Sequence, residues 1–254
     1  MGISISKKKQ IQQLAQKKQR DEQGRFVAEG VKLVGDLLAA GLKPVFIVGY
    51  AEAIKTIGQR CADVQECTEQ EMKAVSSLKT PSPLLAVFEK PKHSENIDTK
   101  QLILVLDEIQ DPGNMGTIIR VADWFGIKQI LCSDNCADAF GPKVVQSTMG
   151  AIARVAIRET NLGDLFARNA REWHLPVYGT FLEGENIYTA KLEQRGFVIM
   201  GNEGKGISNE LKPLITNKLF IPNYPAGSPT SESLNVATAT AVVCSEFRRR
   251  IFCK

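Results

Sequence analysis

The sequence predicts an α/β protein with a small N-terminal α/β unit followed by a larger domain. Two observations give this prediction. After residue 100, short apolar strands alternate with helical segments, which is typical of a mostly parallel sheet with helices on both faces. Before it, residues 91–100 are polar and begin with proline, which marks a linker.

Length and composition are those of an ordinary globular protein. The chain has 254 residues, of which 43% are hydrophobic and 24% charged, enough for one large or two ordinary domains. No apolar run approaches the roughly 18 residues of a membrane span. The basic N-terminus is not followed by the apolar segment of a secretory signal. We therefore expect no membrane partner and a cytoplasmic location.

The N-terminal part is predicted to contain a short amphipathic helix, followed by a stronger helix, a strand, two helices and a strand. Residues 6–20 place Ile11 and Leu14 at helical spacing, and the stronger helix within 26–42 ends near Gly41. The later elements are a strand at 44–50, helices at 51–61 and 67–78, and a strand at 81–91. The predicted domains are 1–92, a linker at 93–100, and 101–254.

In the C-terminal part, helices lie between most of the predicted strands. Its apolar strands are predicted at 102–107, 128–133, 154–158, 176–181, 196–201 and 218–222. Its helices are predicted at 117–126, 142–150, 162–173, 209–215 and 233–250.

Positive charge is concentrated at the ends of the chain. The net charge is +4, but residues 1–25 carry seven Lys or Arg and two acidic residues, so the rest of the chain is about neutral. Arg248, Arg249, Arg250 and Lys254 add a second basic cluster. A basic arm on a near-neutral body favours a polyanionic partner, although a solvated helix face explains the N-terminal charges equally well.

The cysteines do not predict a metal site. The six cysteines form no CxxC pair, and neither His93 nor His174 lies at ligand spacing from them. Reduced, mostly buried thiols are the better interpretation. The sequence assigns no role to Cys132 and Cys136.

Three polar, glycine-rich loops follow predicted strands, where ligands bind in such folds. They read DEIQDPGNMGTIIR (107–120), GNEGKGIS (201–208) and IPNYPAGSPTSESLNVATA (221–239). None has the GxGxxG spacing of a dinucleotide site or the GxxxxGK[ST] pattern of a P-loop. The glycines still allow a ligand close to the backbone, and an adenosine-containing ligand without phosphates meets that requirement.

These three loops resemble the three motifs of the SpoU/TrmH-type RNA ribose 2′-O-methyltransferases of the SPOUT superfamily. The resemblance covers residues 100–250, with DPGNxGxxxR, GNEGxG and ESLNV in order. It implies S-adenosylmethionine as cofactor, a deep C-terminal trefoil knot, and a homodimer through the C-terminal domain that completes the site. The FVAEG stretch also resembles the RNA substrate-binding domain that precedes the catalytic domain in many members.

The resemblance implies five catalytic residues: Arg120, Asn114, Glu203, Ser233 and Asn235. A guanidinium stays protonated in proteins, so we interpret Arg120 as holding the RNA phosphate or the 2′-oxygen, not as a base. Simpler roles exist for the others. Asn114 could be a turn residue, Glu203 could favour a helix N-terminus, and Ser231 or Ser233 could cap the last helix.

The family pattern places the cofactor on backbone around six residues: Thr180, Phe181, Gly201, Ile221, Pro222 and Leu234. Backbone groups would read the edge of the adenine, with Ile221 and Leu234 against its faces. Because the sulfonium is a strong electrophile, the protein mainly supplies alignment.

The predicted activity is methylation of a ribose 2′-hydroxyl in structured RNA, with ribosomal RNA favoured by the preceding domain and the basic N-terminus. Three alternatives are considered: a tRNA 2′-O-methyltransferase, a non-catalytic RNA-binding or ribosome-assembly protein of the same fold, and a base methyltransferase. Loss of Arg, Asn or the loop glycines would indicate a non-catalytic protein, and all are present. DPGNxG together with ESLN argues against base methylation.

Overall fold

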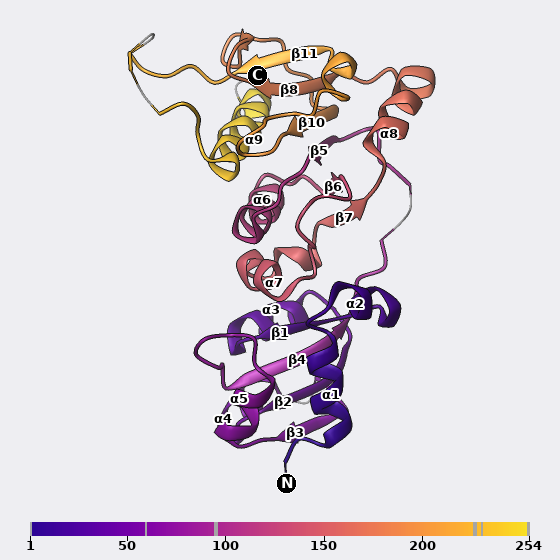
Figure 1. Cartoon of the computed structure of the whole chain (residues 1–254), viewed down its shortest axis with the longest axis vertical. Helices are drawn as coiled ribbons and strands as arrows, with labels where there is room; N and C mark the ends of the chain where they lie inside the picture. Colours follow the sequence, from indigo (N-terminus) through magenta and orange to yellow (C-terminus); the bar gives the residue numbers. More distant parts are fainter. Residues whose placement is uncertain (1, 59, 94–95, 226–227, 230, 253–254) are drawn as a thin grey trace. The chain divides into compact units, whose positions relative to one another are not determined.

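The chain divides into two compact units. The computed structural model describes residues 2–58, 60–93, 96–225, 228–229 and 231–252 (Figure 1). The first unit consists of Met1–His93 and Asp138–Arg154, and the second of Ser94–Ala137 and Val155–Lys254. The predicted domain boundaries did not include the return of the chain to the first unit at Asp138. The division into 1–92, 93–100 and 101–254 stays a prediction. Residues 94 and 95 of the predicted linker lie outside the described residues.

The first unit is built on a four-stranded sheet of order β1-β4-β2-β3. The strands are β1 (Arg25–Glu29), β2 (Pro44–Gly49), β3 (Val64–Glu66) and β4 (Leu84–Glu89). Strand β4 runs antiparallel to β1 and β2, and β3 is parallel to β2. The predicted strands at 44–50 and 81–91 are confirmed.

Strand β1 was not predicted from the sequence, because the apolar residues of β1 continue directly into the helical pattern of the next element. The strand ends at Glu29, and Gly30 then adopts a φ of +115° before α3 (Val31–Ala39) begins. This left-handed region is readily accessible only to glycine, so one residue separates strand from helix. The three-residue strand β3 carries no apolar alternation and was also missed.

The basic N-terminal segment is not a free arm. It forms α1 (Ile5–Gln13) and α2 (Lys17–Gln23), and the side chains of Ile3, Ile11 and Leu14 are buried in the core of the first unit. Several of its cations are paired: Lys7 with Asp63, Lys8 with Glu71, Lys18 with Glu22, and Arg20 with Asp138. The helix-face alternative describes this segment better than a basic arm.

The segment Asp138–Arg154 completes the first unit. The buried Arg20 guanidinium donates to the Asp138 carboxylate and, at 2.7 Å, to the Leu14 carbonyl oxygen. The Phe140 ring contacts Phe26, with 5.2 Å between ring centroids. Helix α7 (Pro142–Thr148) buries Val144 and Val145 and contacts β1. The other helices of this unit are α4 (Ala51–Ile57) and α5 (Glu69–Val75).

The second unit is built on a seven-stranded sheet of order β7-β6-β5-β10-β8-β11-β9, in which all neighbouring strands are parallel. The strands are β5 (Leu102–Leu106), β6 (Gln129–Cys132), β7 (Ala156–Glu159), β8 (Val177–Phe181), β9 (Glu185–Asn186), β10 (Gly196–Met200) and β11 (Asn217–Phe220). The six predicted strands are confirmed, and only the two-residue β9 was missed.

The helices of the second unit differ from prediction mainly at their ends. Helix α6 (Pro112–Trp124) begins five residues early because Asp111 caps it and Pro112 occupies its first turn. Helix α8 (Leu162–Arg168) continues as a π-helical turn (Asn169–Trp173). The helix predicted at 209–215 is only a 3₁₀ turn, Lys212–Leu214, and α9 (Val236–Phe252) starts three residues late.

The C-terminal arginines are largely committed to the fold. Arg248 donates to the Phe125 carbonyl oxygen at the end of α6, and Arg250 donates to the Ala190 and Ile187 carbonyl oxygens. Arg249 and Arg250 both pair with the buried Glu246. These contacts attach α9 to the rest of the second unit, so this cluster is a structural feature and not a free basic patch.

Candidate active site

The three motif loops meet because their strands are neighbours. Strands β5 and β10 pair side by side, β8 pairs with β10, and β11 with β8. All are parallel, so their carboxyl ends lie at one edge of the sheet. The loops after β5 and β10 therefore start next to each other, and the segment after β11 leads to α9, which packs against α6.

The loop after β5 is held by polar contacts from the loop after β10. The buried Asp107 carboxylate accepts a hydrogen bond from the Ser208 backbone N–H at 2.7 Å. Asn202 Nδ2 donates to the Glu108 carbonyl oxygen at 2.9 Å, and Glu108 has a φ of +57°. At the end of the loop, Asp111 Oδ1 accepts from the Asn114 backbone N–H at 2.7 Å and caps α6.

The loop after β10 is a tight turn that requires glycine. The Asn202 N–H donates to the Gly206 carbonyl oxygen and the Gly206 N–H donates back, while Asn202 Oδ1 accepts from the backbone N–H groups of Gly204 and Lys205 at 3.0 Å. A Cβ atom at Gly201 would lie 2.3 Å from the Ile207 nitrogen. A side chain at Gly201 would therefore collide with its own loop before it filled any ligand slot.

Three predicted catalytic residues form one hydrogen-bonded chain, which we call the junction: Glu203, Asn114 and Asn235. Asn114 Nδ2 donates to Glu203 Oε1 at 2.7 Å, and Asn235 Nδ2 donates to Asn114 Oδ1 at 2.9 Å. Asn235 Oδ1 accepts from the Ala237 N–H at 2.9 Å in the first turn of α9. Both amides thus use their donor and acceptor ends, which fixes their orientation. Residues 89 and 121 positions apart are joined at one point.

The junction shows which residue caps α9 and what else that residue contacts. Asn235 Oδ1 accepts from the Ala237 and Thr238 N–H groups and caps α9, a role for which Ser231 and Ser233 were the alternatives. Asn235 also bonds Asn114, so it has both the capping role and a place in the site. Glu203 and Asn235 are exposed and Asn114 is half-buried, so these hydrogen bonds order a surface that is open to a ligand more than they stabilise the fold.

Arg120 and Ser233 are not brought to the junction within one chain. Arg120 lies six residues after Asn114 on α6, a rotation of about 240° and a rise of about 9 Å, and its side chain is exposed. Ser233 is exposed in the segment before α9. Their catalytic roles stay predictions.

The predicted cofactor residues gather at the ends of three neighbouring strands. Gly201 follows β10, Thr180 and Phe181 end β8, and Ile221 and Pro222 follow β11. Thr180 Oγ1 donates to the Ile199 carbonyl oxygen at 3.3 Å. Nearby apolar surface is uncovered, since Leu182 is 66% and Leu234 48% exposed. Backbone groups beside apolar surface fit an adenine ring, so S-adenosylmethionine is compatible with this edge.

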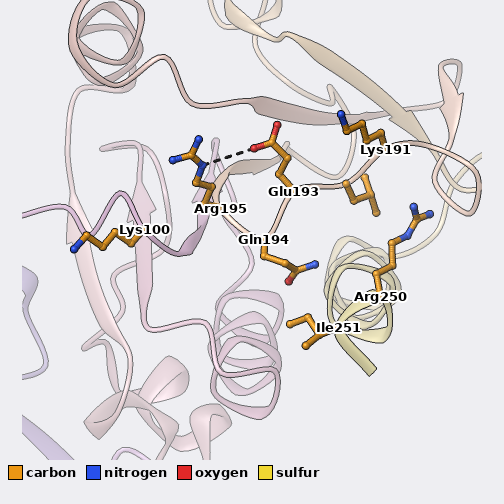
Figure 2. A pocket seen from close by; sticks show the side chains of 8 residues that line it. Lys100, Lys191, Glu193, Gln194, Arg195, Arg250 and Ile251 are labelled. Carbon is orange, nitrogen blue, oxygen red and sulfur yellow. Dashed lines mark ion pairs between the residues drawn. The ribbon is translucent and has the colours of Figure 1, made fainter. Parts of the chain in front are cut away.

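A separate cavity lies at the opposite end of the strands. It has a volume of about 740 Å³ and includes Lys100, just before β5, and Arg195, just before β10. Its other lining residues are Lys191, Leu192, Glu193, Gln194, Arg250 and Ile251 (Figure 2). Arg195 lies 3.7 Å from Glu193, and Gln194 donates to the Phe247 carbonyl oxygen. The cavity contains none of the residues of the three motif loops, so it is not the candidate active site.

Sequence reasoning missed Asp107 and Asn202, which hold two of the loops together, and Asp111, which caps α6. Asp107 and Asn202 directly follow apolar strands and were inside the quoted motifs, so their position after a strand was the available signal. In the described part of the chain, no helix is long and apolar enough to span a membrane. The same residues contain no group of three or more His, Cys, Asp or Glu placed to hold a metal ion.

Known proteins resemble the chain along its whole length. The sequence model of the SpoU rRNA Methylase family matches residues 101–245, and that of the MRM3-like substrate binding domain matches residues 6–86. The 23S rRNA (guanosine(2553)-2′-O)-methyltransferase of Bacillus subtilis is 31% identical over 95% of this chain and 96% of its own.

Two solved structures share this architecture at significant identity. One from Porphyromonas gingivalis, assigned to the TrmH family of RNA methyltransferases, is 41% identical with a TM-score of 0.88, covering 98% of this chain and 100% of that one. An rRNA methyltransferase from Sinorhizobium meliloti with bound AdoMet is 30% identical with a TM-score of 0.84, covering 98% and 97%.

Proposed function

The chain belongs to the SpoU rRNA methylase family, and from this premise we propose that it transfers a methyl group from S-adenosylmethionine to a ribose 2′-hydroxyl of ribosomal RNA. The observation that carries the proposal is the junction, in which side chains from all three motif loops are hydrogen-bonded at the carboxyl edge of the sheet. A location in the cytoplasm is part of the proposal.

Ribosomal RNA is the proposed substrate because the similarity includes both units. The Bacillus subtilis relative, whose name specifies 23S rRNA, aligns with 95% of this chain. The first unit carries the match to a substrate-binding domain, and we propose that it binds RNA. A methyltransferase acting on tRNA is the second candidate.

The cofactor is proposed to lie on Gly201, Thr180, Phe181, Ile221 and Pro222, with Leu234 against the adenine. When bound, it supplies a methyl group on a positively charged sulfur. The junction then positions the acceptor: Glu203 Oε1 is occupied by Asn114, which leaves Oε2 to accept a hydrogen bond from a ribose hydroxyl. Asn114 and Asn235 hold that carboxylate in place, and most of the rate enhancement comes from alignment.

We propose that Arg120 acts across a homodimer interface formed by the second unit. Arg120 and Trp124 lie four residues apart on α6 and share its exposed face, and the Trp124 side chain is 86% exposed. An uncovered indole of this size is typical of an interface. Arg120 of one protomer would then reach the substrate at the partner's junction and hold its phosphate or 2′-oxygen. A deep C-terminal trefoil knot in the second unit is part of the same proposal.

The dimer is tested with Trp124→Glu. The substitution should give a monomer in analytical ultracentrifugation, with the circular dichroism of the native fold and with lost methylation. A dimer of unchanged affinity would show that this face of α6 is not the interface.

The activity is tested by incubating the protein and S-adenosylmethionine with ribosomal RNA and with tRNA. Ribose methylation blocks alkaline cleavage at the next phosphate, because the 2′-oxygen is the nucleophile in that cleavage. A single protected position in ribosomal RNA is the expected result. Protection in tRNA alone would support the second candidate. No protection in any cellular RNA, with S-adenosylmethionine still bound, would identify a non-catalytic RNA-binding protein.

A further inference from the structure

Two cysteines frame the turn that follows β6. Cys132 is the last residue of the strand and is 1% exposed, whereas Cys136 is half-buried. The Cys136 N–H donates to the Ser133 carbonyl oxygen at 3.2 Å and closes the turn. The closed turn holds the two cysteines on either side of it, close enough for the Cys132 thiol to lower the pKa of Cys136.

The Cys136 sulfur lies among polar groups of its own turn and of the loop after β5. It accepts from the Ile109 backbone N–H at 3.3 Å, and the Ser133 hydroxyl lies 3.6 Å away. The hydrogen bond from Cys132, followed by those from Ser133 and Ile109, lowers the pKa of Cys136 to about 7 against the opposing effect of burial. Burial instead raises the pKa of Cys67 to about 11 and that of Cys244 to about 12. Cys136 is thus chemically distinct from these two thiols.

We propose that Cys132 and Cys136 are a redox modification site that low-molecular-weight disulfides such as glutathione disulfide oxidise reversibly. The Cys136 thiolate attacks one sulfur of the disulfide, forms a mixed disulfide and releases one thiolate. Cys132 loses its proton to solvent, and its sulfur then attacks the Cys136 sulfur and expels the second thiolate. Two protein thiols are oxidised to one disulfide, and one small disulfide is reduced to two thiols.

This modification would act on the loop that leads to the junction. In the reduced protein, the Cys136 thiol donates to the Leu106 carbonyl oxygen at 3.3 Å and accepts from Ile109. The same loop contains Asp107 and Glu108, which bind the loop after β10. A disulfide removes the S–H that donates to the Leu106 carbonyl oxygen and binds the sulfur to Cys132, which should weaken the hydrogen bond from Ile109. The consequence for methyl transfer rests on the proposed function; the modification itself does not.

Thiol reactivity gives the first test. At pH 7 about half of Cys136 is thiolate, against about one part in 10⁴ of Cys67, and the weaker nucleophilicity of the more acidic thiol offsets part of that difference. Iodoacetamide should therefore label Cys136 about 10²-fold faster than Cys67, which is also only partly buried. Equal labelling rates would contradict the proposal.

The decisive experiment treats the full-length protein with glutathione disulfide and identifies the products by peptide mass spectrometry. We expect a Cys132–Cys136 disulfide that dithiothreitol reverses, and faster amide hydrogen exchange at Ile109 in the oxidised form. Cys132→Ser should stop at the mixed disulfide on Cys136, Cys136→Ser should form no disulfide at this turn, and the control Cys67→Ser should behave as wild type.

Two outcomes would overturn the proposal: both thiols remaining reduced under conditions that oxidise a small dithiol, or an oxidised protein with unchanged exchange at Ile109. Neither readout requires methyltransferase activity. Failure of the redox site can therefore be distinguished from failure of the proposed function.

Discussion

The junction predicts that Asn114 and Glu203 act as a pair. Asn114→Asp replaces the amide donor with a carboxylate that faces the Glu203 carboxylate across a 2.7 Å contact. A hydrogen bond to a charged group contributes about 1.5–3 kcal/mol, and each 1.4 kcal/mol in the barrier is about tenfold in rate. We expect kcat/KM for methylation to fall about 10- to 100-fold. Asp is favourable in the first turn of α6, so the helix itself should not be weakened.

The reversed pair isolates this contact. In the double variant Asn114→Asp with Glu203→Gln, the glutamine amide can donate to the new carboxylate, which still accepts from Asn235. Asn114→Asp should therefore cost about tenfold less in the Glu203→Gln background than in wild type. The assay is methyl incorporation from labelled S-adenosylmethionine. The control is Asn209→Asp, whose oxygen still accepts from Lys212 Nζ. An equal effect of Asn114→Asp in both backgrounds would refute the pairing.

Three other features give quantitative expectations. Arg20→Met leaves the Asp138 carboxylate without its buried partner and should lower the free energy of unfolding in urea by about 3–5 kcal/mol. The control Lys18→Met removes an exposed ion pair and should lower the free energy of unfolding by less than about 1 kcal/mol. Equal losses in the two variants would contradict the difference in burial. Gly201→Ala should weaken the affinity for S-adenosylmethionine, measured by calorimetry, roughly tenfold or more, because the new Cβ collides with the Ile207 nitrogen. The control Gly204→Ala should bind normally, because the nearest atom to its Cβ is 3.7 Å away. Equal affinities would show that the loop after β10 is not part of the cofactor site. Hydrogen bonds from the Thr68 backbone N–H, then from Lys8 and the Ile3 N–H, lower the pKa of Glu71 to about 2. The contribution of the Glu71 carboxylate to stability is therefore complete above about pH 4.5 and lost as the pH falls towards 2. The difference in Tm between wild type and Glu71→Gln should shrink over that window, and a constant difference would show that Glu71 ionisation is not coupled to folding.

The sequence predicted the parallel sheet well because its strands are buried on both faces. A continuous apolar run such as 102–106 has one simple explanation, whereas β1 runs directly into the apolar face of α3 and is hidden by it. The three motif loops were also identifiable, since glycine and asparagine after a strand have few structural uses. The hydrogen bonds among them depend on strand order, which periodicity does not encode.

The sequence could not show that residues 138–154 belong to the first unit. The apolar pattern of α7 predicts that Val144 and Val145 are buried. It does not indicate which sheet they pack against, because any apolar sheet surface would bury them equally well. What selects the first unit is specific chemistry, the Asp138 carboxylate opposite Arg20 and the Phe140 ring against Phe26. Such pairings link residues more than 100 positions apart, and no local signal marks them. For the same reason, the sequence could not show that Arg20 is a core residue instead of part of a basic arm.

The return of the chain at Asp138 has a consequence for how the protein is made. During synthesis the first unit cannot close when residue 93 leaves the ribosome, because Arg20 still lacks its carboxylate and β1 still lacks α7. At about 5–20 residues per second, roughly 6–24 s separate the synthesis of Arg20 from that of Asp138. During that interval β5 and β6 of the second unit are also synthesised. The first unit therefore has all of its residues only after residues 94–137 of the second unit have been synthesised, in contrast to the strict domain-by-domain order of simple tandem proteins.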